Sequence, residues 1–132
     1  MYQQVIIVGY LGRDPEMRYT PAGQAVTSLS IATSRQWTGA TGEKLKETTW
    51  FRVSAWGKQA ETCNNYLRKG SKVLVQGRLM PDPATGGPRT WQDRDGAVRA
   101  SYEMTAELVR FLSNRERGSD EALQDEADDI PF

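Results

Sequence analysis

Two indoles and a guanidinium share one face of a segment that reads as a β-strand. In residues 49–56, Trp50, Arg52 and Trp56 stand at alternate positions, and alternate side chains of a strand point to the same side. The opposite face carries residues suited to a barrel interior: Phe51, Val53 and Ala55. Indole faces stack on nucleobases at about 1–3 kcal/mol each and tolerate any base. The pattern predicts a surface that binds single-stranded nucleic acid without reading its sequence; burial of Trp50 or Trp56 in a subunit interface is the alternative.

Two further tryptophans stand beside basic residues in segments that read as hairpins. Trp37 follows Arg35, and Trp91 lies between Arg89 and Arg94. An indole with a neighbouring cation can stack on a base and neutralise a phosphate at the same place. We therefore expect both tryptophans, with Arg35 and Arg89, to contact nucleic acid. The alternative is that each indole packs only within its own hairpin.

Other basic residues could extend the path of the phosphates beyond the tryptophans. The positions predicted for this role are Arg18, Arg52, Lys58, Arg68, Lys69 and Lys72. Lysine and arginine neutralise phosphates in any sequence, so such a path adds affinity without specificity. For each position the alternative is an ordinary solvated surface charge.

The composition removes the most common catalytic and metal-binding chemistry. The chain has no histidine and one cysteine, Cys63, so Cys/His zinc sites and Ser-His-Asp or Cys-His catalysis are excluded. Glu103 and Glu107 form the best pair for a carboxylate-only site, although a solvated strand face explains them more simply. We expect no enzymatic activity, no metal and no cofactor. The lone cysteine favours a reducing compartment, and no apolar run is long enough to span a membrane.

The neutral net charge conceals a basic body and an acidic end. Residues 119–132 hold six acids and no base, which leaves residues 1–118 with 17 bases against 11 acids. A basic body predicts a polyanionic ligand, and the acidic segment predicts a separate role. Its apolar last residues suit a recognition peptide whose terminal ring enters an apolar pocket. The residues predicted to bind partner proteins are Asp128, Asp129, Ile130, Pro131 and Phe132; a purely solubilising tail is the alternative.

Short β-segments separated by turn signals must position these side chains. The predicted strands are residues 4–12, 17–35 as two strands joined at 20–23, 48–57, 72–80 and 97–112. Residues 36–47 read as a protruding hairpin or loop, and the Pro/Gly-rich residues 81–88 read as a loop. In residues 72–80, one strand face is predicted to carry Val73, Val75, Gly77 and Leu79.

Apolar spacing predicts one helix, over residues 58–69, with Ala60, Cys63 and Leu67 inward and Gly70 as its end. The order is then three strands, a helix and two strands. Because closure of a small barrel removes free sheet edges, we expect a mainly all-β fold. The predicted architecture is a five-stranded OB-fold barrel with the helix between strands three and four.

Five motifs carry a resemblance to a known family. They are residues 8–16 (VGYLGRDPE), 50–53 (WFRV), 66–70 (YLRKG), 75–79 (VQGRL) and 128–132 (DDIPF). With them the sequence resembles the bacterial single-stranded DNA-binding proteins over nearly its whole length. The resemblance implies an OB-fold, a homotetramer built as a dimer of dimers, and single-stranded DNA wrapped over its outer surface. It also implies a cytoplasmic, nucleoid-associated protein whose C-terminal tip docks proteins of DNA replication, repair and recombination.

The resemblance assigns roles to individual residues. It implies that Trp37, Trp50 and Trp91 occupy the stacking positions of the family, and that Trp56 stands where a phenylalanine is usual. It places at or near basic positions of the DNA path Arg18, Arg52, Lys58, Arg68 and Lys69.

Three departures from the family pattern matter. Phe51 stands where well-known members carry histidine, near subunit contacts, so it bears on the stability of the oligomer. The loop at 81–88 is longer and richer in proline and glycine than usual, which bears on the reach of Trp91. The usual long linker is nearly absent, because residues 113–123 span roughly 18 Å as a flexible coil. We therefore expect weak linker-driven association between neighbouring tetramers.

These observations predict three segments. Residues 1–112 form an OB-fold domain for single-stranded DNA binding and oligomerisation, residues 113–127 a short disordered acidic linker, and residues 128–132 a tip that recruits partners. The predicted function is sequence-independent binding and protection of single-stranded DNA by stoichiometric coating. The alternative is an OB-fold protein-interaction module of a primosome-like assembly.

Overall fold

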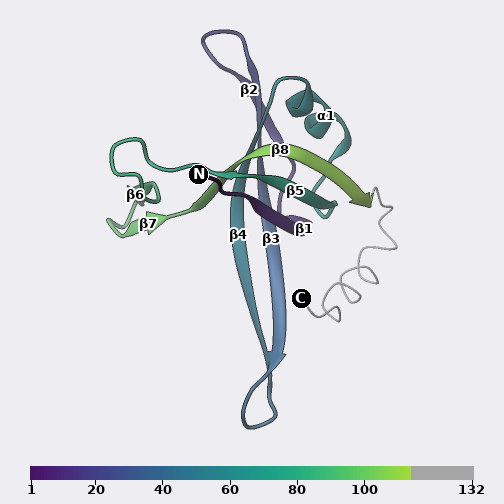
Figure 1. Cartoon of the computed structure of the whole chain (residues 1–132), viewed down its shortest axis with the longest axis vertical. Helices are drawn as coiled ribbons and strands as arrows, with labels where there is room; N and C mark the ends of the chain where they lie inside the picture. Colours follow the sequence, from purple (N-terminus) through teal and green to yellow (C-terminus); the bar gives the residue numbers. More distant parts are fainter. Residues whose placement is uncertain (114–132) are drawn as a thin grey trace.

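The computed structural model of the chain describes residues 1–113 (Figure 1). In that range the elements are β1 (Val5–Leu11), β2 (Glu16–Tyr19), β3 (Ala25–Thr38), β4 (Lys44–Trp56), α1 (Lys58–Tyr66), β5 (Lys72–Leu79), β6 (Thr90–Gln92), β7 (Val98–Ala100) and β8 (Tyr102–Ser113). The strands predicted from β1 to β5 and the loop predicted at 81–88 are confirmed. No helix within residues 1–113 is long and apolar enough to cross a membrane.

Five of the strands close into a barrel. The sheet order is β1-β5-β8-β4-β3-β2, and pairing of β1 with β3 at Tyr10↔Ala32 and Leu11↔Ile31 closes it. β2 extends the sheet outside the closed ring, beside β3. β4 and β8 run parallel, and α1 joins β4 to β5, the third and fourth strands of the barrel in chain order. The predicted five-stranded barrel with one helix is therefore confirmed.

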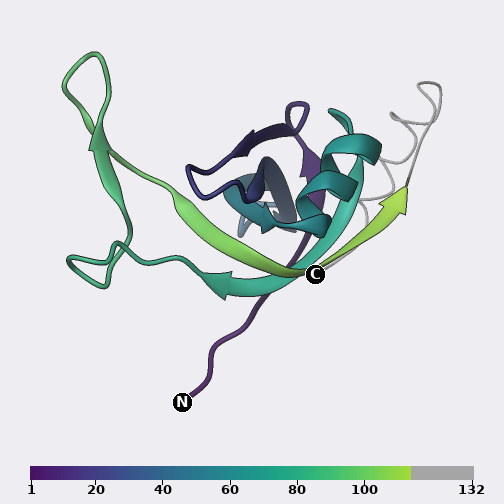
Figure 2. The ribbon, with the colours of Figure 1, turned by 90° about the horizontal axis from the view of Figure 1, so that it is seen from above.

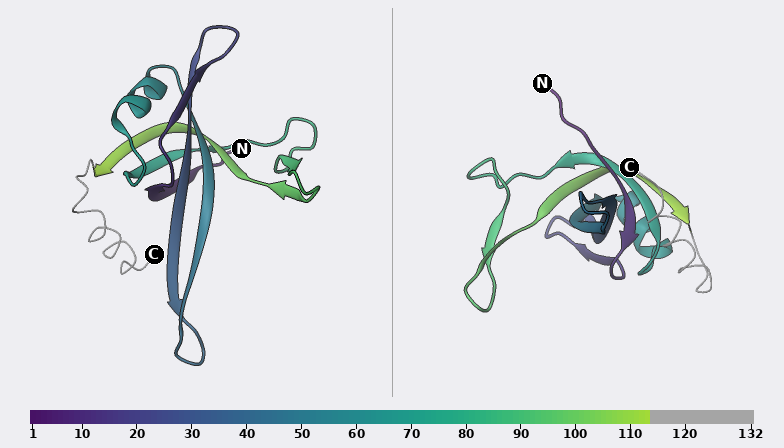
Figure 3. Two further views of the ribbon diagram at one scale, coloured as in Figure 1. Left: turned by 180° about the vertical axis from the view of Figure 1, so that it is seen from behind. Right: turned by 90° about the horizontal axis from the view of Figure 1, so that it is seen from below.

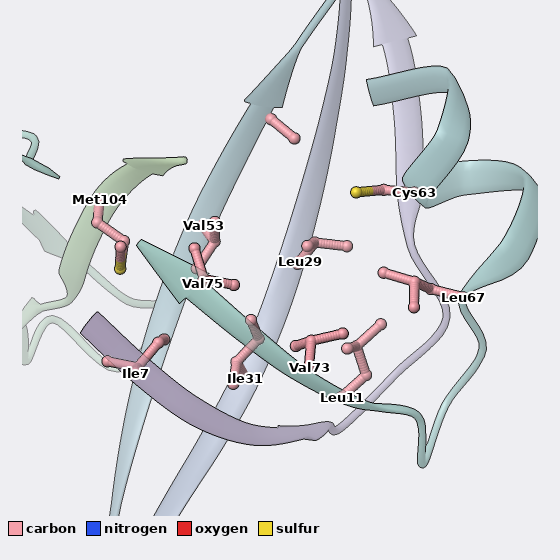
Figure 4. Close-up of a cluster of buried hydrophobic side chains, with 11 residues drawn as sticks. Ile7, Leu11, Leu29, Ile31, Val53, Cys63, Leu67, Val73, Val75 and Met104 are labelled. Atoms are coloured by element: carbon pink, nitrogen blue, oxygen red, sulfur yellow. The ribbon is translucent and has the colours of Figure 1, made fainter. Parts of the chain in front are cut away.

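The barrel interior is filled by the side chains that alternation assigns to it. Leu29 and Ile31 of β3 are covered, as are Val53 of β4 and Val73 and Val75 of β5 (Figure 4). Leu79 departs from the predicted face, because 47% of it is exposed. It lies beyond the register shift at Gln76/Gly77, where β8 passes so close that a side chain on Gly77 would strike the carbonyl of Thr105.

The helix α1 closes one end of the barrel with Ala60 and Cys63, as predicted. Burial raises the pKa of the Cys63 thiol to about 11, so the thiol stays protonated and unreactive at neutral pH. The helix is shorter than predicted, because it ends at Tyr66 and Leu67 is already extended. Gly70, with a φ of 90°, shapes the turn after the helix and not the helix end itself.

Two hairpins project from the barrel. The predicted hairpin over 36–47 is confirmed, since β3 and β4 remain paired from Val26↔Trp56 out to Thr38↔Lys44 and extend far below the barrel in Figure 1. The second, formed by β6 and β7, stands to one side of the barrel in Figure 2; we call residues 90–100 the arm. The single strand predicted over 97–112 is thus wrong, because residues 98–100 pair with β6 and only the rest joins the barrel.

Candidate nucleic-acid interface

An open groove lies between the barrel wall and the arm. Its volume is about 790 Å³, and it brings together Trp50 and Arg52 of β4 and Trp91 of β6. The arm and the β3–β4 hairpin leave the barrel in different directions in both views of Figure 3, so the groove lies in the angle between them. Three of the predicted contact residues therefore line one hollow, although two come from β4 and one from the arm.

Small side chains on β3 make the floor of this groove. Ala32 lies opposite Trp50 in the β3–β4 register, and Ser30 lies opposite Arg52. Directly opposed residues on one face of a sheet have neighbouring Cβ atoms, so each large residue of β4 stands beside a short one of β3. The result is a row of exposed rings and charge along a lowered strip. Hydroxyl groups also line the groove, from Ser28, Ser30, Thr48, Thr49 and Ser101.

Trp50 and Arg52 are both available to a ligand. Trp50 is 53% exposed, and its indole lies against the backbone of Gly12. Arg52 is exposed and, within residues 1–113, has no ion-pair partner. A guanidinium without a carboxylate partner, two residues along from an indole, is suited to hold a phosphate while the indole stacks on a base.

Trp91 is positioned by a compact turn in the arm. The carboxylate of Asp93 accepts hydrogen bonds from the backbone N–H groups of Asp95 and Ala97, and from Arg99 Nε at 2.9 Å. The Arg99 guanidinium holds the pKa of Asp93 below its ordinary value. Arg99 also lies opposite Trp91 in the β6–β7 register. Trp91 is thereby held at the edge of the groove, 48% exposed.

Two aromatic residues in the groove were missed by the analysis of the sequence as contacts. Tyr102, at the start of β8, is 62% exposed and lines the groove with Phe51 of β4. Their ring centroids lie 5.8 Å apart, with the ring planes tilted by 37°. Alternation assigns both to the barrel interior. Only the parallel pairing of β4 with β8, which sequence does not reveal, places them side by side at the open end of the barrel.

The other two tryptophans lie outside the groove. Trp56 is on the same face of β4, at its far end, where the register places Val26 and then Arg18 beside it. Trp37 is on the distal part of the β3–β4 hairpin. The guanidinium of Arg35 lies over its ring, 4.6 Å from the centroid.

The remaining predicted basic residues are scattered over other elements. Arg35 and Arg89 have carboxylate partners: Arg35 Nε lies 3.3 Å from Glu47, and Arg89 Nε lies 4.0 Å from Glu103. Arg68 donates to the carbonyl of Leu67 at 2.8 Å, so part of its role is structural. None of the groove-lining residues is Lys58, Lys69 or Lys72. The predicted partner-binding residues 128–132, and the linker predicted before them, lie outside the described range.

Comparisons with known proteins bear on this surface. The model of the single-strand binding protein family matches residues 2–112. A single-stranded DNA-binding protein of Helicobacter hepaticus is 38% identical over 91% of this chain and 66% of its own length. One from Neisseria meningitidis serogroup A is 37% identical over 93% of this chain and 67% of its own. The chain thus spans about two thirds of these curated relatives.

A solved structure shares the fold. It is a deletion mutant of the single-stranded DNA binding protein from Thermus aquaticus, with a TM-score of 0.64 and 31% sequence identity. The match covers 85% of this chain and 51% of the other.

Proposed function

The chain belongs to the single-strand binding protein family, and from this premise we propose that it coats single-stranded DNA without regard to sequence. The observation that carries the proposal is the groove in which Trp50, Trp91 and the unpaired Arg52 meet. The indoles stack on bases and the guanidinium neutralises phosphate. Both interactions are available to every nucleotide, so affinity arises without selection.

The groove offers little means of reading base edges. Its polar side chains are largely hydroxyls, as at Ser30 and Thr49, and a hydroxyl rotates to donate or to accept. The same groove therefore accommodates different bases. Coating is stoichiometric, so the proposal includes no catalytic role. Within residues 1–113 no cluster of His, Cys, Asp and Glu could hold a metal ion.

The proposal includes assembly as a homotetramer, a dimer of dimers. In the described residues β1 pairs with β3 only at Tyr10 and Leu11, so the edge of β1 before them is open on that side. Ile6 and Leu112 leave large apolar surfaces exposed. An open strand edge and exposed apolar side chains are features that further copies of the chain would cover.

Two further roles rest on the sequence and on family membership. We propose that residues 128–132 recruit proteins of DNA replication, repair and recombination, by inserting the Phe132 ring in an apolar pocket beside basic groups. We also propose that the protein acts in the cytoplasm, at the nucleoid, because its ligand is there.

Titration with poly(dT), followed by intrinsic tryptophan fluorescence at low and high salt, tests the coating function. We expect saturable quenching, because bases stack on Trp50 and Trp91, and an affinity that falls as salt rises. A duplex of equal length is the control, since its bases are already stacked and its addition should quench weakly. If poly(dT) causes no quenching at low salt, the tryptophans are structural and the protein-interaction module becomes the better reading.

A further inference from the structure

An aromatic pair stands at the open end of the barrel without a role in packing that explains its exposure. Phe51 is half-buried and packs against the core cluster. Tyr102 is 62% exposed, although it is in a barrel strand beside Phe51. A tyrosine that lies this open loses most of the stabilisation that burial of its ring would give. The pair therefore calls for a ligand that stacks on rings.

We propose that Phe51 and Tyr102 form an additional nucleobase-binding position of the groove, next to those of Trp50 and Trp91. The inference rests on the proposed function and names residues beyond the tryptophans. Phe51 and Tyr102 line the same hollow as the two indoles, so a strand in the groove passes all four rings. A ring centroid distance of 5.8 Å is within the range of favourable aromatic pairs, so Phe51 supports the Tyr102 ring.

Pre-organisation makes this position effective. Phe51 is anchored in the core cluster, and Met104, two residues beyond Tyr102, is fully buried. Both backbones are held by the parallel β4–β8 register Phe51↔Tyr102. The rings thus lose little freedom when a base arrives, which lowers the cost of binding.

The charges of the groove favour a nucleotide over a second copy of the chain as the occupant. Arg13 and Arg52 line the hollow that contains the aromatic pair, and Arg52 has no carboxylate partner within residues 1–113. Burying Arg52 under another protein surface would leave a charge to be compensated. A nucleotide supplies a ring for Tyr102 and a phosphate for Arg52 at once.

Cross-linking on the wild-type protein tests the position directly. Oligo(dT) carrying 5-iododeoxyuridine at successive positions is bound, irradiated, and the cross-linked peptides are identified by mass spectrometry. We expect cross-links at Tyr102 or Phe51 as well as at the tryptophans. Cross-links confined to the tryptophans would overturn the inference while leaving the coating function intact. A wild-type protein that binds no oligo(dT) would instead overturn the proposed function itself.

Two variants of the full chain supply the energetic test. Tyr102→Leu keeps the apolar bulk and removes the π-face, so we expect roughly a 5- to 150-fold loss of affinity for oligo(dT), as for other base-stacking rings. Tyr102→Phe keeps the ring and should bind within about twofold of wild type. Sedimentation at the same concentrations reports the oligomer. If Tyr102→Leu changes the oligomeric state, or if both variants bind like wild type, the base-binding role is wrong.

Discussion

The indole of Trp50 occupies the space that a side chain on Gly12 would fill. A Cβ built on Gly12 would lie 2.5 Å from Cη2 and Cζ3 of the Trp50 ring. The backbone at Gly12 is fixed, because its N–H donates to the carbonyl of Ser30 at 2.9 Å. Trp50 therefore takes its orientation over the groove from the absence of a side chain on the loop after β1.

Replacing Gly12 with valine should weaken binding of single-stranded DNA without touching any contact residue. The valine displaces the indole, so we expect a loss approaching that of Trp50→Ala, about 1–3 kcal/mol for a stacking ring. Fluorescence titration with poly(dT) measures it. In a Trp50→Ala background the same change should cost almost nothing more, because the group that it displaces is gone. Additive losses would mean that Gly12 acts through something other than Trp50.

Alternation along β4 was sufficient to predict the composition of both faces of that strand. Val53 and Ala55 are buried and Trp50 and Arg52 are exposed, because register in a half-buried strand is set by the apolar face. The barrel followed from the same reasoning. The arm did not, because residues 98–100 are separated from β8 only by a break at Ser101.

The groove could be predicted only in part, because it depends on pairing between strands distant in sequence. Trp50 and Arg52 are neighbours on β4, so their proximity is visible in the sequence. Trp91 reaches them through the arm, and Tyr102 through the parallel β4–β8 pairing. Neither relation has a local signal.

Trp37 should contribute less to DNA binding than the groove tryptophans. The guanidinium of Arg35 lies over its ring at 4.6 Å, so one face of the indole is already occupied. We expect Trp50→Ala and Trp91→Ala each to cost about 1–3 kcal/mol and Trp37→Ala to cost about 1 kcal/mol or less. Titration of the three variants with the same oligo(dT) gives the ranking. A larger loss at Trp37 than at either groove position contradicts it.

Arg52 and Arg89 should differ in how they affect the salt dependence of binding. Arg52 has no carboxylate partner within residues 1–113, whereas Arg89 Nε lies 4.0 Å from Glu103. Removing one phosphate contact lowers the slope of log K against log salt by about 0.7 for a single strand. We expect this change for Arg52→Gln and a smaller one for the matched variant Arg89→Gln. Equal slopes for wild type and Arg52→Gln would remove Arg52 from the phosphate path.

The arm should lose its fixed turn in acid. The hydrogen bond from Arg99 holds the pKa of Asp93 below its ordinary value of 3.8, so the folded arm binds its proton less readily than an unfolded one. The stabilisation is then fully present above pH 3.8 and is lost as the pH falls through the lower pKa of the folded state. The amide signals of Asp95 and Ala97, which donate to Asp93, report this by NMR.

The variant Asp93→Asn separates the turn from the rest of the molecule. Asparagine keeps an acceptor oxygen for the backbone N–H groups of the turn but removes the charge that holds Arg99. We therefore expect the acid transition of the Ala97 amide to disappear, while the barrel amides remain unchanged. Because Trp91 lies opposite Arg99, the variant should also bind oligo(dT) more weakly at neutral pH, and by no more than Trp91→Ala does. An unchanged acid transition in Asp93→Asn would show that a different group controls the arm.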